Sequence, residues 1–269
     1  MNPFLPYVQS LKESFLAVKG TTASGHRSIL ESPSKALIFS PHPDDECIIG
    51  LLPLRMKNEL GIQVVNVPVT FGSHLPRRAE RAEELTNACN YLGWHLHQER
   101  SSLEPLEVTD IVKILTEYQP EVIFFPHDQD WNSRHISTNR LLLDALQLMP
   151  KSFSCHVINT EYWGAMTNPN LMIEAEDEDL ATLIAATSLH IGEVERNPYH
   201  LSLPFWMQDN VRRGSELVSG QGGTASTFTF ATLYRIHRWQ NGELIAYTEK
   251  ARTVPTGANN LQQLFSPWK

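Results

Sequence analysis

The chain contains only three cysteines, Cys47, Cys89 and Cys155. They are odd in number and far apart, and they form neither a CxxC pair nor a disulfide framework. This pattern is typical of a reducing compartment, so we predict a cytoplasmic protein. The N-terminal segment likewise lacks the basic region and continuous apolar region of a secretory signal.

Basic charge and long apolar runs are also scarce. The 22 Lys and Arg residues are outnumbered by 30 Asp and Glu residues, which gives a formal net charge of -8. A broad basic surface for nucleic acid is therefore not expected. No segment approaches the roughly 20 apolar residues of a membrane-spanning helix, so no membrane span is predicted.

The sequence does contain a regular alternation of strand-like and helix-like segments. Strands are expected at 35–40, 62–72, 95–98, 121–126 and 154–164, and helices at 47–61, 76–93, 108–119, 137–149 and 180–195. This alternation predicts an α/β protein with a Rossmann-like open, mostly parallel sheet and helices on both faces. The segment 224–250, with Asn241-Gly242 at its centre, predicts a C-terminal β-hairpin.

The motif His-Pro-Asp-Asp-Glu at 42–46 directly follows the first expected strand. Its ionisable side chains stand between apolar neighbours and are costly to desolvate unless something pairs with them. His42 and Asp45 could share one Zn²⁺, leaving Asp44 free to contact a metal-bound water. Alternatively, Asp44 or Asp45 caps a helix that has Glu46 in its first turn. Spacing alone leaves both interpretations open.

A catalytic zinc needs a third protein ligand and an open coordination position. His127 and His135 both follow the expected strand 121–126. In an open α/β sheet, ligands bind beyond the carboxyl ends of the strands, which is also where His42 is expected. These two histidines are therefore the candidates for the third ligand.

These segments resemble the N-acetylglucosaminyl-phosphatidylinositol de-N-acetylase family, also called PIG-L or LmbE-like. Its first hallmark, an apolar strand followed by His-Pro-Asp-Asp-Glu, is matched at 42–46 without a substitution. Its Arg-x-x-Glu-x-x-x-Ala-x-x-x-Leu-Gly helix is matched at 81–93, and its Asp-x-His-x-x-His motif is matched in part by Asp130 and His135. The order of elements agrees over roughly 35–165.

The resemblance implies a zinc-dependent hydrolase that removes an N-acetyl group from a small molecule, most plausibly an N-acetylglucosamine conjugate. It implies zinc bound by His42, Asp45 and His135, with Fe²⁺ as the alternative metal. Asp44 would be the general base toward the metal-bound water, and Arg81 would contact the substrate.

The resemblance also implies the organisation of the chain. We expect one LmbE-like domain over 1–269, with its core at about 35–165 and with 166–269 completing the substrate pocket. Homo-oligomers occur in the family, so assembly of several copies is compatible with the resemblance.

One position departs from the family pattern. The family usually has a histidine three residues before its last ligand, and this chain has Asn132 there. Asn132 can donate a hydrogen bond to a substrate but cannot transfer a proton near neutral pH. His74 and His237 are candidates to replace that histidine by placement only. The departure keeps two alternatives open: a deacylase of a non-sugar N-acyl amine, and a metal- or sugar-binding homologue without turnover.

Overall fold

The structure is a computed structural model that describes residues 5–22, 34–97, 103–222, 224–246 and 251–265. Within these ranges, nine strands form one sheet. The strands are β1 (Lys35–Ser40), β2 (Gln63–Pro68), β3 (His95–Leu96), β4 (Val122–Pro126), β5 (Cys155–Thr160), β6 (Leu171–Ala175), β7 (Phe230–Gln240), β8 (Glu243–Ala246) and β9 (Arg252–Val254).

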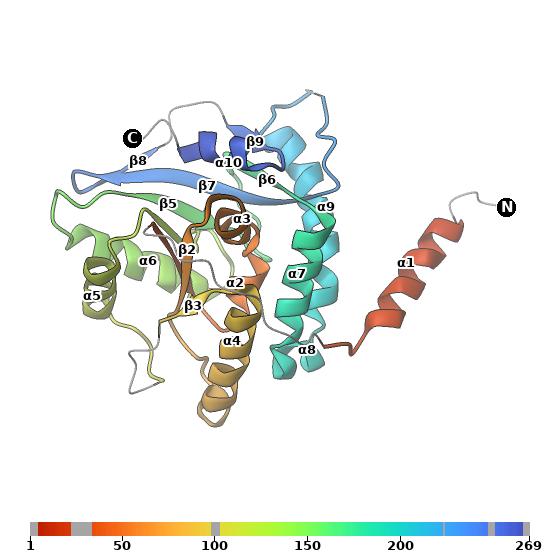
Figure 1. The fold of residues 1–269 in the computed structure, drawn as a ribbon, viewed down its shortest axis with the longest axis horizontal. Coiled ribbons are helices and arrows are strands. Elements are labelled where there is room, and N and C mark those ends of the chain that lie inside the picture. Colours follow the sequence, from red (N-terminus) through yellow and green to blue (C-terminus); the bar gives the residue numbers. More distant parts are fainter. Residues whose placement is uncertain (1–4, 23–33, 98–102, 223, 247–250, 266–269) are drawn as a thin grey trace.

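Helices alternate with these strands, and those other than α1 cover the sheet, whereas α1 lies apart from it (Figure 1). They are α1 (Leu5–Val18), α2 (Asp45–Ile48), α3 (Leu51–Leu60), the 3₁₀ turn η1 (Leu75–Arg77), α4 (Arg78–Leu92), α5 (Val108–Tyr118), α6 (Ser133–Gln147), α7 (Asp177–Ser188), α8 (Ile191–Arg196), α9 (Tyr199–Leu217) and α10 (Ala258–Phe265). None of the helices in the described ranges combines the length and the apolar character that a bilayer crossing requires.

The strand order is β3-β2-β1-β4-β5-β7-β6-β9, with β8 paired to β7. The five strands from β3 to β5 run parallel to one another, and β7 is antiparallel to both β5 and β6. The predicted fold class, a mostly parallel α/β sheet, is therefore confirmed. Because β1 and β4 are parallel neighbours, their carboxyl ends lie side by side at one edge of the sheet.

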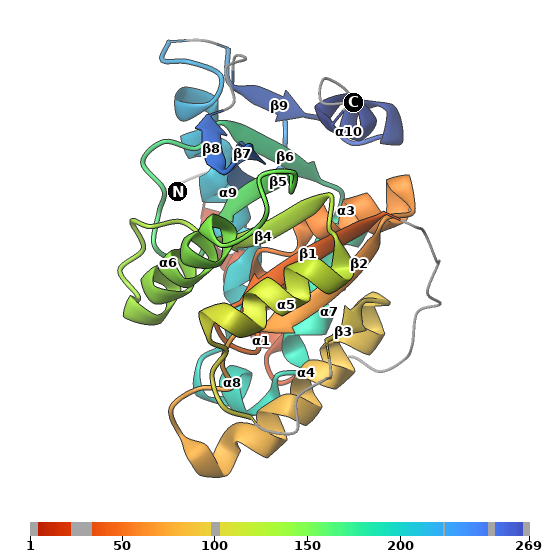
Figure 2. The ribbon, with the colours of Figure 1, turned by 90° about the vertical axis from the view of Figure 1, so that its left-hand side faces the viewer.

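Helices cover both faces of the parallel part of the sheet, as predicted. Leu37 and Phe39 of β1 pack with residues of α5 and α6, whereas Ala36 and Ile38 pack with residues of α3, α4, α7 and α9. Figures 1 and 2 show these two groups of helices on opposite sides of β1 and β2. Burial on both faces explains why the strands appear in the sequence as continuous apolar runs.

The predicted C-terminal hairpin forms between β7 and β8. Gln240 pairs with Glu243, so Asn241 and Gly242 are the two turn residues. Both turn residues have positive φ angles, 56° and 82°, as a type I′ turn requires. The last residues of the predicted hairpin, 247–250, lie outside the described residues.

The single helix predicted at 47–61 is wrong, because the structure has two helices with a break at Ile49 and Gly50. A Cβ on Gly50 would lie 2.7 Å from the carbonyl oxygen of Glu46, so only glycine fits this bend. The Tyr234 hydroxyl donates to the carbonyl of Ile49 at 2.6 Å and accepts from the N–H of Leu52 at 3.0 Å. A residue of β7 therefore satisfies the backbone groups that the break leaves open.

Removal of this hydroxyl is expected to destabilise the fold. In Tyr234→Phe, the buried backbone groups of Ile49 and Leu52 lose a partner, so the free energy of unfolding should fall by about 1–3 kcal/mol. Urea denaturation measures the change. Tyr118→Phe is the matched control, because its hydroxyl contacts His97 at only a partly buried position and should cost less than about 1 kcal/mol. Equal losses in both variants would contradict this role of Tyr234.

Candidate metal centre and active site

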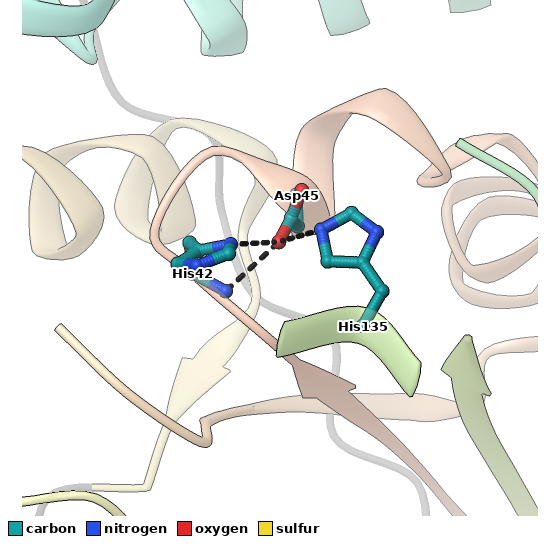
Figure 3. A group of neighbouring side chains, drawn as sticks. All are labelled: His42, Asp45 and His135. Carbon is teal, nitrogen blue, oxygen red and sulfur yellow. Dashed lines mark hydrogen bonds and ion pairs between the residues drawn. The ribbon is translucent and has the colours of Figure 1, made fainter. Parts of the chain in front are cut away.

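The His-Pro-Asp-Asp-Glu motif forms a tight loop from the end of β1 into α2. The backbone N–H of His42 donates to Asp45 Oδ2 at 2.8 Å, and His42 Nδ1 lies 3.1 Å from the same oxygen (Figure 3). The loop therefore turns the His42 ring and the Asp45 carboxylate toward each other.

The third member of the group, His135, comes from the first turn of α6. This helix begins at Ser133, four residues earlier than predicted, because Asn132 caps it: Asn132 Oδ1 accepts from the N–H of Arg134 at 2.9 Å. The earlier start places His135 at the edge where β1 and β4 end. His135 Nε2 lies 3.4 Å from Asp45 Oδ2, and the His135 and His42 ring centres are 5.5 Å apart (Figure 3).

His42, Asp45 and His135 together form a group that could hold a metal ion, since one ligand atom from each lies within 4.8 Å of the others. Two imidazoles and one carboxylate are the donor set of many catalytic zinc sites. The other ring nitrogen of His135, Nδ1, lies 2.9 Å from the buried carboxylate of Asp130. A carboxylate in this position fixes the orientation of a metal-binding histidine, so the residues present fit the predicted zinc.

The charged side chains of this group shift one another's pKa values strongly. Burial acts to raise the pKa of Asp45, but His135 and His42 outweigh it and hold that pKa well below its usual range. Burial also acts to lower the pKa of His135, but the carboxylates of Asp45 and Asp130 raise it to about 10. His135 is therefore protonated near neutral pH, and its proton occupies the nitrogen that faces Asp45.

Asp44, the predicted general base, occupies the N-cap position of α2 but makes no side-chain capping hydrogen bond. The helix-start interpretation therefore does not account for this residue. Its side chain is buried, and burial together with the neighbouring Asp45 carboxylate raises its pKa well above the usual range, while Arg81 opposes the rise. Arg81 Nη2 lies 3.7 Å from Asp44 Oδ1 and donates to the carbonyl of Pro43 at 2.9 Å.

The structure thus brings Arg81 beside the Asp44 carboxylate, and it gives Asn132 a helix-capping hydrogen bond. Their predicted contacts with substrate stay predictions. The other histidines considered from the sequence lie outside the group. His127 has both ring nitrogens occupied, by the Gly164 carbonyl at 2.8 Å and the N–H of Gln129 at 3.1 Å. His74 is exposed in the loop before η1, and His237 is buried in β7.

Two further residues around the loop have roles that the sequence analysis did not assign. Asp130 orients His135, and its place in the partly matched Asp-x-His-x-x-His motif was the available signal. His190 lies between α7 and α8, and its Nε2 is 2.8 Å from Glu46 Oε1 of the motif. No local pattern marks His190, because this contact spans 144 positions of the chain.

The fold and site define an α/β protein with a His-Asp-His group at the carboxyl ends of its parallel strands. Residues 37–146 match the family model PIG-L, described as GlcNAc-PI de-N-acetylase. The predicted resemblance is therefore confirmed over the segment that holds His42, Asp44, Asp45, Arg81, Asn132 and His135. A comparison with curated protein sequences found no match.

Several solved structures share the fold. N,N′-diacetylchitobiose deacetylase from Pyrococcus horikoshii is 17% identical, with a TM-score of 0.55 over 92% of this chain and 97% of that chain. A zinc-inhibited form of teicoplanin deacetylase is 16% identical, with a TM-score of 0.54 over 77% of this chain and 99% of that chain. The 4-carboxy-2-hydroxymuconate hydratase GalB from Pseudomonas putida KT2440 is 14% identical, with a TM-score of 0.57 over 76% of this chain and 95% of that chain.

The raised pKa of His135 predicts that metal binding releases a proton. Without metal, His135 is protonated below about pH 10, and a metal ligand must have its nitrogen free. Zinc affinity should therefore increase as the pH rises toward 10. Calorimetry at pH 8, in two buffers of different ionisation enthalpy, measures the protons released per zinc.

Asp130→Asn removes one of the two carboxylates that raise the pKa of His135. This variant should release fewer protons per zinc than the wild type. Asp128→Asn makes the same change at an exposed site two residues away and should behave as the wild type. Zinc binding without proton release in the wild type would contradict the binding of zinc by a protonated His135.

Proposed function

We propose that this protein is a zinc-dependent N-deacetylase that hydrolyses the acetamide of a small molecule, with an N-acetylglucosamine conjugate as the first candidate substrate. The observation that carries the proposal is the convergence of His42, Asp45 and His135 beside the buried carboxylate of Asp44. The deacetylase names of the family model and of two structural neighbours support the same reaction.

In this mechanism, His42, Asp45 and His135 hold the metal, and Asp130 keeps the His135 ring in the ligating orientation. When bound, zinc lowers the pKa of a coordinated water toward about 7 and polarises the amide carbonyl. Fe²⁺ is the alternative metal, since imidazole and carboxylate ligands suit both ions.

Asp44 is the proton-transfer group of the mechanism. Its raised pKa makes the ionised carboxylate a stronger base, which favours accepting a proton. Asp44 takes a proton from the attacking water as the bond to the amide carbon forms. When the C–N bond breaks, Asp44 returns the proton to the leaving nitrogen, because Asn132 cannot supply one. Arg81 offsets the negative charge of Asp44 before the transfer.

The rest of the chain is proposed to shape the substrate pocket. Residues 1–269 would form one domain, with 166–269 completing the pocket around the core at 35–165. We also propose a cytoplasmic location, in keeping with the buried, unpaired state of Cys47, Cys89 and Cys155, and assembly into a homo-oligomer.

A second candidate substrate is a non-sugar N-acyl amine, and Asn132 is the observation that favours it. The residue stands where the resembling family usually has a histidine, and its side-chain oxygen is engaged in capping α6. A homologue without turnover is the third candidate. The hydratase with the same fold adds a reason to test the reaction directly.

Metal content is expected to depend on His135. The wild-type protein should purify with, or take up, about one zinc per chain and release amine from N-acetylglucosamine or a conjugate of it. His135→Ala should lose both the zinc and the activity, whereas His74→Ala removes an exposed histidine and should keep both. Elemental analysis and amine detection on the same samples measure the two quantities. A wild type that binds no zinc even when zinc is supplied would refute the proposal.

Asp44→Asn separates an enzyme from a binding protein. The variant keeps the shape of the side chain but cannot accept a proton, so the rate should fall about 10²–10⁴-fold while the zinc content stays unchanged. Amine release from N-acetylglucosamine and from an N-acetylated arylamine without a sugar also distinguishes the two substrate classes. An unchanged rate in Asp44→Asn would contradict the role of Asp44 as base.

A further inference from the structure

A fully buried hydrogen bond joins the motif loop to the C-terminal third of the chain. Glu46 lies in α2 and His190 lies between α7 and α8, and both side chains are 0% exposed. His190 Nε2 lies 2.8 Å from Glu46 Oε1. We assign the ring proton to Nε2, the tautomer in which His190 donates to Glu46. Among the described residues, Nδ1 of His190 has no hydrogen-bond partner, so Glu46 is the contact that orients the ring.

The second oxygen of Glu46 holds the backbone of Asp44. Glu46 Oε2 accepts from the N–H of Asp44 at 3.0 Å. Asp44 has a φ angle of 106°, in a region that residues with a side chain rarely adopt. A backbone held there needs contacts that outweigh the strain, and the Glu46 carboxylate supplies one. His190, Glu46 and the Asp44 amide therefore form one continuous chain of hydrogen bonds.

The first turn of α8 is also linked to the Asp44 carboxylate indirectly, through Arg81. Glu193, three residues after His190, lies 3.8 Å from Arg81 Nε, and Arg81 lies 3.7 Å from Asp44 Oδ1. The same turn is fastened to α4, because the N–H of Gly192 donates to Glu84 Oε1 at 2.9 Å. The segment 190–193 is thus linked to the backbone of Asp44 through Glu46 and to its carboxylate through Arg81.

We propose that His190 is a positioning residue for Asp44: by orienting Glu46, it holds the loop backbone in the conformation that presents the Asp44 carboxylate beside the candidate metal ligands. The proposal rests on the proposed function only in naming Asp44 as the base. The C-terminal third would then position Asp44 in addition to shaping the pocket.

The competing interpretation is a second metal site. Glu46, Cys47 and His190 also offer ligand atoms within 4.8 Å of one another. In the structure, however, Cys47 Sγ donates to Glu46 Oε1 at 3.1 Å, and Glu46 is bonded to His190. Glu46 Oε1 is thus occupied by both Cys47 and His190, so we expect no metal there.

The test compares substitutions of His190 that differ in hydrogen-bond reach. The amide nitrogen of Gln overlaps the position of Nε2, whereas that of Asn overlaps Nδ1 and cannot reach Glu46. Leu removes the donor altogether. His200→Leu is the matched control, because His200 is also buried in the C-terminal third and has no partner for either ring nitrogen among the described residues.

Amide hydrogen exchange and kcat both test whether Asp44 keeps its position. Amide hydrogen exchange of the peptide covering 42–48 should accelerate at least about 10-fold in His190→Leu and His190→Asn. It should stay near the wild-type rate in His190→Gln and His200→Leu. With a substrate identified by amine release, kcat should fall about 10-fold or more in the first two variants, with KM and zinc content unchanged.

Each outcome decides for or against the proposal. Wild-type exchange and kcat in both His190→Leu and His190→Asn would overturn it, as would equal effects of Asn and Gln. A second equivalent of zinc in the wild type, lost in His190→Leu, would replace it with a second metal site. If His190→Leu does not fold, the Asn and Gln variants decide. A wild type inactive on every substrate would refute the proposed function alone, because the exchange rates still test the position of Asp44.

Discussion

The candidate site depends on the Asp45 carboxylate, which receives the two histidines from opposite sides. One of its oxygens is contacted by the backbone and ring of His42 and lies 3.4 Å from His135 Nε2. The two histidines are 93 positions apart, and only the sheet brings them together. Because β1 and β4 are parallel neighbours, the loop after β1 and the first turn of α6 reach the same edge. The buried strands β1 and β4 thus position the loop after β1 and the first turn of α6, and Asp45 connects these two segments.

His135 and Asp44 are each held by residues outside the group of candidate metal ligands. Asp130 holds the far nitrogen of His135, Glu46 holds the backbone of Asp44, and Arg81 lies beside the Asp44 carboxylate. Asp130 and Glu46 are buried, so their hydrogen bonds are made in a medium where an unpaired group is costly. A site built in this way presents its ligands in one arrangement before a metal or substrate arrives.

The sequence predicted the features that local chemistry determines and missed those that distant segments determine. The strand 35–40 and the Asn241-Gly242 turn each carry a signal within a few positions, and both predictions agree with the structure. The helix break at Gly50 depends on the Tyr234 hydroxyl, which contacts the Ile49 carbonyl. Because these residues are 185 positions apart, no local sequence pattern predicts the break. His190 is a further case, since neither its neighbours nor its spacing relate it to Glu46. The predicted start of α6 is four residues late for a different reason: Asn132, which stands at the position of a catalytic histidine of the family, is the cap of this helix.

The charge balance of the site explains why its arrangement suits a divalent cation. Asp44, Asp45, Glu46 and Asp130 are all buried, and four carboxylates in one small volume repel one another. In the metal-free state, part of this repulsion is offset by Arg81 and by the proton that Asp45 and Asp130 hold on His135, whose pKa they raise to about 10. A metal that replaces this proton brings two positive charges instead of one. It also favours the ionised form of Asp44, whose pKa burial raises, and so prepares that carboxylate to accept a proton. The same carboxylates that strain the metal-free site are therefore what would make it bind a cation and act as a base.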